Sequence, residues 1–232
     1  MVQNLKITDI VVMRINDKKP FPQKVLKQLM QSDDLEKDDK ATILKTLAKS
    51  GEYGLAANLY LELGMKEQAA QAYEKNRQYI TAANLYLELG MKEQAAKAYE
   101  KNNNYPAAAN LYLELGMREK VIRCAQALEM NDEYGLAANF YLELELKKNA
   151  SECAQTCESN GKYGLAADIY LKLEMKEEAA ECAKACEEKE EYYNAATIYT
   201  RLGMKEKVAE MQVLLGNLKE ATRILKQMES IN

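Results

Sequence analysis

The sequence contains no histidine and no tryptophan, and it has few prolines and phenylalanines (three and two). Without histidine, the chain lacks the usual general base of serine and cysteine nucleophiles and the commonest metal-binding side chain. It also lacks a glycine-rich phosphate loop and a G-x-S-x-G motif. We therefore expect no catalytic residue, no cofactor and no metal centre, and we interpret the protein as a non-enzyme.

Long apolar runs and basic clusters are missing as well. No stretch approaches the roughly 18 apolar residues that a bilayer span requires, and the first residues do not have the layout of a secretory signal. The net charge is −4 and no basic face is evident, which argues against nucleic-acid binding. Five cysteines are an odd number for a disulfide framework. We expect a cytoplasmic protein with reduced thiols and no membrane insertion.

What the sequence does contain is an internal repeat. The stretch AANLYLELGMKEQAA stands at residues 56–70 and again, unchanged, at residues 82–96. Related units begin at tyrosines spaced 26, 26, 29, 29 and 29 residues apart, namely Tyr53, Tyr79, Tyr105, Tyr134, Tyr163 and Tyr192. Repeats of this length are typical of a solenoid, in which each unit buries its apolar face against the next unit.

Each unit is predicted to form two short helices. In the first unit, Ala56 and Ala57 lie on the apolar face of the first helix, and Gly64 is placed to end that helix. The second helix is expected to bury Ala69 and Tyr73. Because helices of this length are marginal alone in water, they must be stabilised by stacking on their neighbours.

This pattern resembles the tetratricopeptide repeat, whose signature places a large residue, small residues and a tyrosine on the first helix and A-x3-F on the second. The first unit matches that signature with Tyr53, Ala56, Ala57, Tyr60, Ala69 and Tyr73. The units are shorter than the family's roughly 34 residues and lack its closing proline. In later units the second aromatic residue is replaced, by Ala125, Ala154, Ala183 and Gln212. Two of the turn glycines are replaced as well, by Glu145 and Glu174.

The resemblance implies an all-α, right-handed solenoid of stacked antiparallel helical hairpins. We predict an extended segment over residues 1–20, capping helices over 21–52, six repeats over 53–215 and a capping helix over 216–232. Asp38 or Asp39 is the expected N-cap of the second N-terminal helix. Residues 7–17 have a strand-like composition, which indicates an extended tail or a junction to another domain.

The longer spacing predicts longer second helices. Three added residues are nearly one helical turn, so we expect the second helix to be one turn longer from the third unit onward. The curvature of the superhelix is then expected to change near residues 117–134.

The cysteines follow the repeat, which leaves two interpretations. Four thiols on adjacent helices are able to hold zinc. In other units, however, alanine or methionine stands where the chain has Cys124, Cys153 and Cys182, and cysteine behaves as a small apolar core residue. We favour the core interpretation, also for the pair Cys157 and Cys186.

Two polar columns run along the first helices. One consists of Asn58, Asn84, Asn110, Asn139 and Asp168, and the other of Glu62, Glu88, Glu114, Glu143, Lys172 and Arg201. First helices line the concave groove in tetratricopeptide proteins, so the resemblance implies that these asparagines clamp a peptide backbone. The glutamates then favour a ligand with basic residues, and an apolar ridge adjoins them at Leu61, Leu87, Leu113, Leu142 and Leu171. The alternative for both columns is a solvated face copied by duplication.

The resemblance therefore implies a non-catalytic scaffold or adaptor for protein–protein interaction. We expect it to bind a peptide segment or helix of a partner on its concave face, and we expect this ligand to be basic with apolar anchors. Two alternatives stay open. One is a self-assembling structural repeat protein, hence a homo-oligomer, and the other is the sensor or interaction module of a larger multidomain machine.

Overall fold

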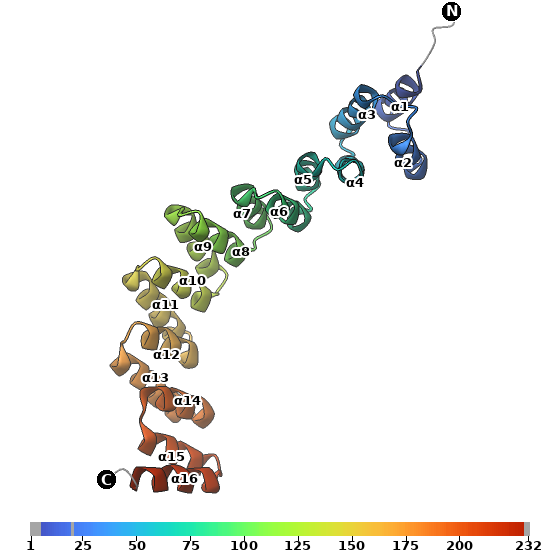
Figure 1. Cartoon of the computed structure of the whole chain (residues 1–232). Coiled ribbons are helices and arrows are strands. Elements are labelled where there is room, and N and C mark those ends of the chain that lie inside the picture. The colour runs from blue at the N-terminus through green and yellow to red at the C-terminus, as the bar shows by residue number, and fades with distance from the viewer. Residues whose placement is uncertain (1–5, 20, 230–232) are drawn as a thin grey trace, which may run out of the picture. The chain divides into compact units, whose positions relative to one another are not determined.

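A computed structural model describes residues 6–19 and 21–229 of the chain. All regular secondary structure in these residues is α-helical, so the predicted all-α class is confirmed (Figure 1). The helices are α1 Ile7–Asn16, α2 Gln23–Gln31, α3 Lys37–Ser50, α4 Tyr53–Glu62, α5 Lys66–Lys75, α6 Tyr79–Glu88, α7 Lys92–Lys101, α8 Tyr105–Glu114, α9 Arg118–Met130, α10 Tyr134–Glu143, α11 Lys147–Ser159, α12 Tyr163–Lys172, α13 Lys176–Glu188, α14 Tyr192–Leu202, α15 Lys205–Leu214 and α16 Leu218–Glu229.

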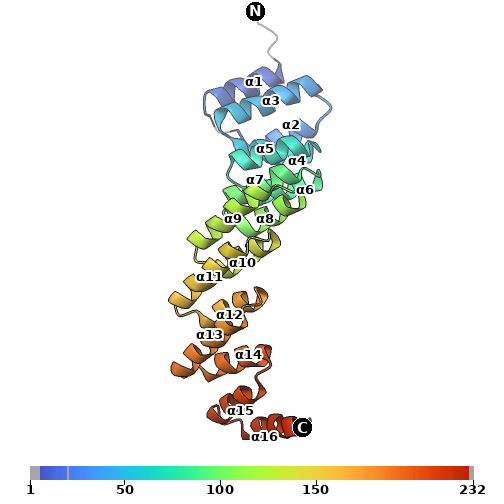
Figure 2. The same cartoon turned by 90° about the vertical axis from the view of Figure 1, so that its left-hand side faces the viewer.

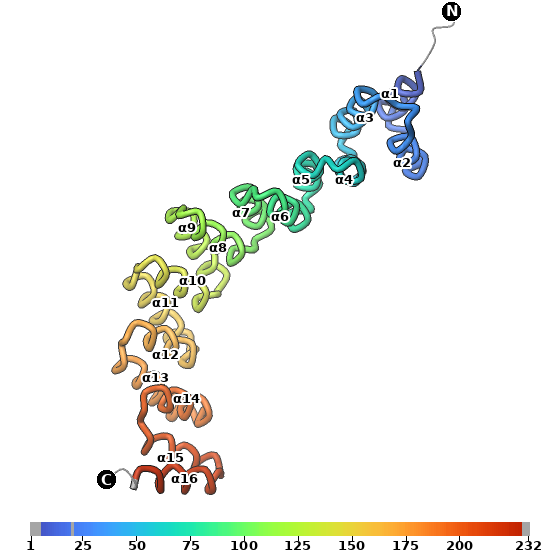
Figure 3. Tube along the Cα trace, viewed as in Figure 1, coloured from blue at the N-terminus to red at the C-terminus, as the bar shows by residue number. Residues whose placement is uncertain are grey.

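The chain forms two compact units, Met1–Met117 and Arg118–Asn232. In the first unit, neighbouring helices pack against each other all the way from α3 to α8. In the second unit, the same holds from α9 to α16. Figures 2 and 3 show the short turns at which the chain reverses between successive helices. Each unit is thus an α-solenoid stack, as the repeat predicts, and the handedness of the superhelix stays a prediction.

Pairs of small residues let the helices approach closely. Ala56 and Ala57 on α4, and Ala82 and Ala83 on α6, are completely buried. The space beside the alanines is filled by aromatic rings such as that of Tyr86. Because these helices are too short to be stable alone in water, their stability comes from this packing between neighbours.

The turns between first and second helices require a left-handed backbone conformation. Glycine provides it at Gly64 and Gly90, where φ is 73° and 72°. Glu145 and Glu174, which replace two of the turn glycines, adopt the same conformation with φ of 58° and 64°. A residue with a Cβ atom pays roughly 1–2 kcal/mol in this region, so the substitutions preserve the turn at a cost in stability.

Replacing Glu145 by glycine should therefore stabilise the second unit. We expect the free energy of unfolding to rise by about 0.5–1 kcal/mol, because relief of the left-handed strain outweighs the larger entropy of glycine in the unfolded chain. Chemical denaturation measures the change. As a control, Glu152→Gly in the middle of α11 should lower stability by about 1 kcal/mol, and a loss of stability in Glu145→Gly would contradict the explanation.

The second helices are longer from the third to the fifth unit, as predicted, but not in the sixth. Helices α5 and α7 have 10 residues, and α9, α11 and α13 have 13. The expectation of a longer helix in the sixth unit is wrong, because α15 has 10 residues. Gly216, with φ of 77°, follows it and allows α16 to begin 26 residues after α14. Within the second unit, the first helices α10, α12 and α14 also contact one another in sequence. The predicted change of curvature near residues 117–134 stays a prediction.

The N-terminal region differs most from expectation. The predicted extended segment is wrong for residues 7–16, which form helix α1; residues 1–5 and 20 lie outside the described part of the chain. Val11 and Ile15 are buried against α3, and this burial overrides the weak helix propensity of β-branched residues. Three helices rather than a pair therefore precede the first repeat, since α3 packs on α1 and α4 while α2 packs on α4.

The predicted N-cap of α3 is also corrected. Glu36 occupies the N-cap position, and Asp38 and Asp39 lie in the first turn of the helix. Carboxylates in the first turn are favoured by the positive end of the helix dipole. The two aspartates therefore stabilise the start of the helix through the dipole rather than as capping residues.

Candidate interaction surface

The asparagine column lies on successive first helices. Asn58, Asn84 and Asn110 are exposed on α4, α6 and α8 of the first unit. Asn139 and Asp168 are half-buried on α10 and α12 of the second unit. We call the side of the first helices that carries these residues the first-helix face. In each unit, the column therefore follows the repeat as the sequence predicts.

In the first unit, two of these asparagines bond to the second helix of their own repeat. The hydroxyl of Tyr73 donates to Asn58 Oδ1 at 2.6 Å, and that of Tyr99 donates to Asn84 Oδ1 at 3.1 Å. Both tyrosines are the second aromatic residues of the repeat signature. In the third repeat this position is Ala125, so Asn110 has no tyrosine there to accept from. Asn58 and Asn84 therefore join the two helices of a hairpin.

In the second unit, the column instead joins one first helix to the next. Lys172 on α12 donates to Asn139 Oδ1 on α10 at 2.6 Å. Arg201 on α14 pairs with Asp168 on α12. Both cations belong to the predicted charge column, so the structure brings the two columns together here. These bridges match the direct contact between successive first helices in this unit.

The glutamates of the first unit are paired with lysines. Lys66 of α5 lies 2.7 Å from Glu88 of α6, and the same 2.7 Å separates Lys92 of α7 from Glu114 of α8. Each pair joins the second helix of one repeat to the first helix of the next. Exposed pairs of this kind contribute about 0–1 kcal/mol, so the carboxylates exchange partners at little cost.

Glu62 of the first unit and Glu143 of the second unit have other surroundings. Glu62 pairs with Lys27 of α2. Glu143 is exposed, and Arg118, the residue that corresponds to Lys92, donates to the carbonyl oxygen of Leu144 at 2.7 Å instead. Each of the three glutamates on the first-helix face of the first unit is thus paired with a lysine from another helix.

The leucine ridge adjoins these charges. Leu61 and Leu87 are more than a third exposed, on α4 and α6. Leu113, Leu142 and Leu171 occupy the equivalent positions and are half-buried. Each first helix of the first unit therefore presents an amide, a leucine and a glutamate within two turns. This combination is able to contact a peptide backbone, an apolar side chain and a cation at the same time.

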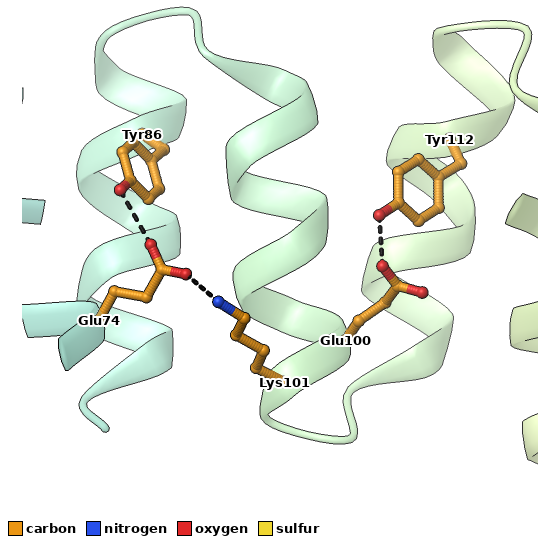
Figure 4. A network of polar contacts seen from close by, with 5 residues as sticks. All are labelled: Glu74, Tyr86, Glu100, Lys101 and Tyr112. Carbon is orange, nitrogen blue, oxygen red and sulfur yellow. Dashed lines mark hydrogen bonds and ion pairs between the residues drawn. The ribbon is translucent and has the colours of Figure 1, made fainter. Parts of the chain in front are cut away.

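A series of tyrosine–glutamate hydrogen bonds, which we did not predict from the sequence, joins adjacent repeats in the core. We call it the tyrosine–glutamate ladder. Tyr86 donates to Glu74 at 3.0 Å and Tyr112 donates to Glu100, while Glu74 also pairs with Lys101 (Figure 4). In the second unit, the same contact joins Tyr141 to Glu129, Tyr170 to Glu158 and Tyr199 to Glu187. The signal is present in the sequence, because a glutamate stands 12 residues before each of these tyrosines.

This arrangement keeps the tyrosine hydroxyls protonated. Burial, followed by the hydrogen bond to Glu158, raises the pKa of Tyr170 far above its usual value. Burial and Glu74 act in the same way on the pKa of Tyr86. A neutral hydroxyl that donates to a carboxylate is a charge-assisted hydrogen bond, which is stronger than one between two neutral groups. The ladder therefore fastens the second helix of one repeat to the first helix of the next.

The cysteines are core residues, as predicted. All five are buried and none of them forms a disulfide, and no cluster of potential metal ligands occurs in the described residues. Burial is the main cause that raises the pKa of Cys182 to about 12 and that of Cys186 to about 11. The Cys153 thiol donates to Glu129 at 3.1 Å, and its pKa is raised as well. These thiols are therefore protonated at neutral pH.

The raised pKa values predict protected thiols. At pH 8, a thiol-specific reagent should label the native protein at least about 100-fold more slowly than the unfolded chain, because the thiolate fraction is small and burial blocks access. The protonated thiols also contribute to the free energy of unfolding. This contribution is fully present below the pKa of the thiols in the unfolded chain, and it should be lost as the pH rises through their pKa values in the folded protein, about 11 and 12. Rapid labelling of native Cys182 or Cys186 at pH 8 would contradict this account.

Comparisons with known proteins agree with the repeat. The family model described as Tetratricopeptide repeat matches residues 79–101, which form the hairpin of α6 and α7. The comparison with curated proteins gave no match. Among solved structures, the crystal structure of BtubC (BKLC) from P. vanneervenii aligns with 97% of this chain and 93% of that chain, at 15% identity. The TM-score of this alignment is 0.23, so the two structures do not superimpose closely.

In the part of the chain that the structure describes, no helix is long and apolar enough to span a bilayer. The family match and the run of short helices packed in sequence agree with the spacing of alanines and tyrosines. Repeats of this kind are generally protein-interaction modules and are typically not catalytic. The chain is a helical-repeat protein that is similar to the tetratricopeptide repeats, and residues 79–101 match their family model.

Proposed function

We propose that the chain is a non-catalytic scaffold that binds an extended segment or a helix of a partner protein on its first-helix face. One observation supports the proposal above all: the first helices of the first unit repeat the same set of an exposed asparagine, a partly or fully exposed leucine and an exposed glutamate. The set is Asn58, Leu61 and Glu62 on α4, Asn84, Leu87 and Glu88 on α6, and Asn110, Leu113 and Glu114 on α8. A row of identical groups at a fixed spacing suits a ligand with a regular backbone.

The chemistry of the row selects the ligand. Exposed leucines favour apolar anchors on the ligand, and the glutamates favour lysine or arginine beside those anchors. The glutamates are held in exposed lysine pairs at 2.7 Å, and such pairs are weak enough for a basic ligand to replace the lysines. We therefore propose a basic partner segment with apolar anchors. The buried, protonated thiols support a reducing location such as the cytoplasm.

Selection from a random-peptide display library tests the proposal. The variant for comparison exchanges both ion pairs, as Lys66→Glu with Glu88→Lys and Lys92→Glu with Glu114→Lys. It keeps the net charge and the salt bridges while it places cations where the glutamates stand. We expect wild type to enrich basic, leucine-containing peptides and the exchanged variant to lose them.

A second variant tests the asparagine column. Asn110→Ala should weaken binding of the enriched peptides about tenfold, which corresponds to one lost hydrogen bond to the peptide backbone. Asn58 and Asn84 are unsuitable for this test, because their substitution also removes the acceptor of a tyrosine hydroxyl. Circular dichroism checks the fold of each variant. Failure of wild type to enrich any motif, or equal enrichment by the exchanged variant, would overturn the proposal.

A further inference from the structure

Helix α1 has two apolar faces, and one of them is uncovered. Thr8, Val11 and Ile15 are buried on the side that packs against α3. On the other side, Ile10 is 53% and Met13 is 59% exposed. Exposed apolar side chains that adjoin one another on a helix mark interaction sites, so this side of α1 suits an interface.

Charges at both ends of this face complete a symmetric pattern. Lys6, Ile10, Met13 and Asp17 are exposed and follow one another at four, three and four residues, which places them on one side of the helix. We call them the α1 stripe. The pattern is basic, apolar, apolar and acidic, and it is centred between residues 11 and 12. In an antiparallel copy of the helix, the basic residue therefore lies opposite the acidic one and the two apolar residues lie opposite each other.

The helix dipole explains why these charges need a partner. Lys6 stands at the N-cap and Asp17 at the C-cap of α1. A cation at the positive end and an anion at the negative end both oppose the dipole of their own helix. Beside an antiparallel copy of α1, each of them lies at the favourable end of the neighbouring helix. Asp17 pairs with Lys19 at 3.0 Å on the surface, and such exposed pairs exchange easily.

We infer that the chain forms a twofold dimer in which α1 pairs with α1 of a second copy in antiparallel orientation. Ile10 of one copy packs against Met13 of the other, and Lys6 of one copy pairs with Asp17 of the other. The twofold axis doubles each contact, as in any isologous interface. The interface of one short helix pair lies at the small end of specific protein interfaces, so the dimer is weak and depends on concentration. This inference is independent of the first-helix face.

Sedimentation equilibrium of the full chain tests the inference. We expect the mass to rise from 26.3 kDa toward twice that value as the concentration increases, over a range from about 1 μM to 1 mM. A protein that stays monomeric over this range overturns the inference, including the case in which a different protein covers α1.

Charge exchange identifies the pairing. Each single variant, Lys6→Asp or Asp17→Lys, places like charges opposite each other at both of the symmetry-related contacts. Each should therefore weaken the dimer about tenfold or more. The combined variant, Lys6→Asp with Asp17→Lys, restores opposite charges and should recover dimerisation relative to both single variants. Lack of recovery in the combined variant overturns antiparallel pairing.

Two further variants separate this interface from general surface stickiness. Ile10→Ser should weaken the dimer about tenfold, whereas Ile80→Ser, which removes a similarly exposed isoleucine from α6, should leave it unchanged. Mixing Ile10→Cys chains with Met13→Cys chains under mild oxidation should give more disulfide-linked dimer than either chain alone. Equal effects of the two serine variants, or no excess of mixed disulfide, overturn the assignment to α1. Circular dichroism confirms that each variant is folded.

Discussion

Replacing Tyr170 by alanine is expected to lower the free energy of unfolding by about 3–5 kcal/mol. The side chain is 2% exposed on α12, and its hydroxyl donates to Glu158 of α11 at 3.0 Å. The substitution therefore leaves a cavity between two repeats and a carboxylate without its donor. Chemical denaturation of the purified protein measures the loss.

The conservative variant separates packing from hydrogen bonding. Tyr170→Phe keeps the ring and removes the hydroxyl, so it should cost about 1–2 kcal/mol. Tyr193 is 74% exposed on α14, and Tyr193→Ala should change stability by less than about 0.5 kcal/mol. If Tyr170→Phe is as stable as wild type, the tyrosine–glutamate ladder does not fasten the repeats.

Replacing Ala83 by leucine should destabilise the first unit by about 1–3 kcal/mol or more. Ala83 is completely buried on α6, where the small side chain allows neighbouring helices to approach. Three additional carbon atoms fit there only if the helices move apart, which also weakens their other contacts. Chemical denaturation measures this change as well.

The same helix provides a matched control. Thr81→Leu introduces the same side chain at an exposed position of α6, and it should change stability by less than about 0.5 kcal/mol. If the two leucine variants are equally stable, the alanines do not set the distance between helices, and the explanation of the fold by close packing is wrong.

The repeat made most of the fold predictable. Ala56, Ala82 and their equivalents recur every 26 or 29 residues, which indicates a surface that packs against its own copy, so burial of these alanines follows from the sequence. The core role of the cysteines was predictable for the same reason, since Cys153 and Cys182 occupy the position of alanine in other units. A position repeated in every unit carries information that a single helix does not.

The N-terminal helix could not be predicted in this way. Residues 7–16 belong to no repeat, and their β-branched residues indicate a strand. They form α1 because Val11 and Ile15 pack on α3, a contact that local sequence does not report. The N-cap at Glu36 and the length of α15 were missed because both depend on where a turn places the neighbouring helix.

The candidate surface was predictable in position but not in its contacts. The columns were expected on the first helices, where the structure has them. Their partners depend on the side chain that the neighbouring helix offers, which is Tyr73 for Asn58 in the first unit and Lys172 for Asn139 in the second. Corresponding residues of different repeats therefore have different hydrogen-bond partners, and the sequence pattern of a single helix does not reveal these partners.

Photo-cross-linking tests the proposed binding face most directly. A photoreactive phenylalanine derivative is introduced at Leu87, on the first-helix face of α6, and in a separate variant at Gln94, which is exposed on α7. Both variants are irradiated with a library-selected basic peptide. We expect a cross-link from position 87 and little from position 94. Equal or stronger cross-linking from position 94 would contradict binding on the first-helix face, because the peptide would then bind elsewhere.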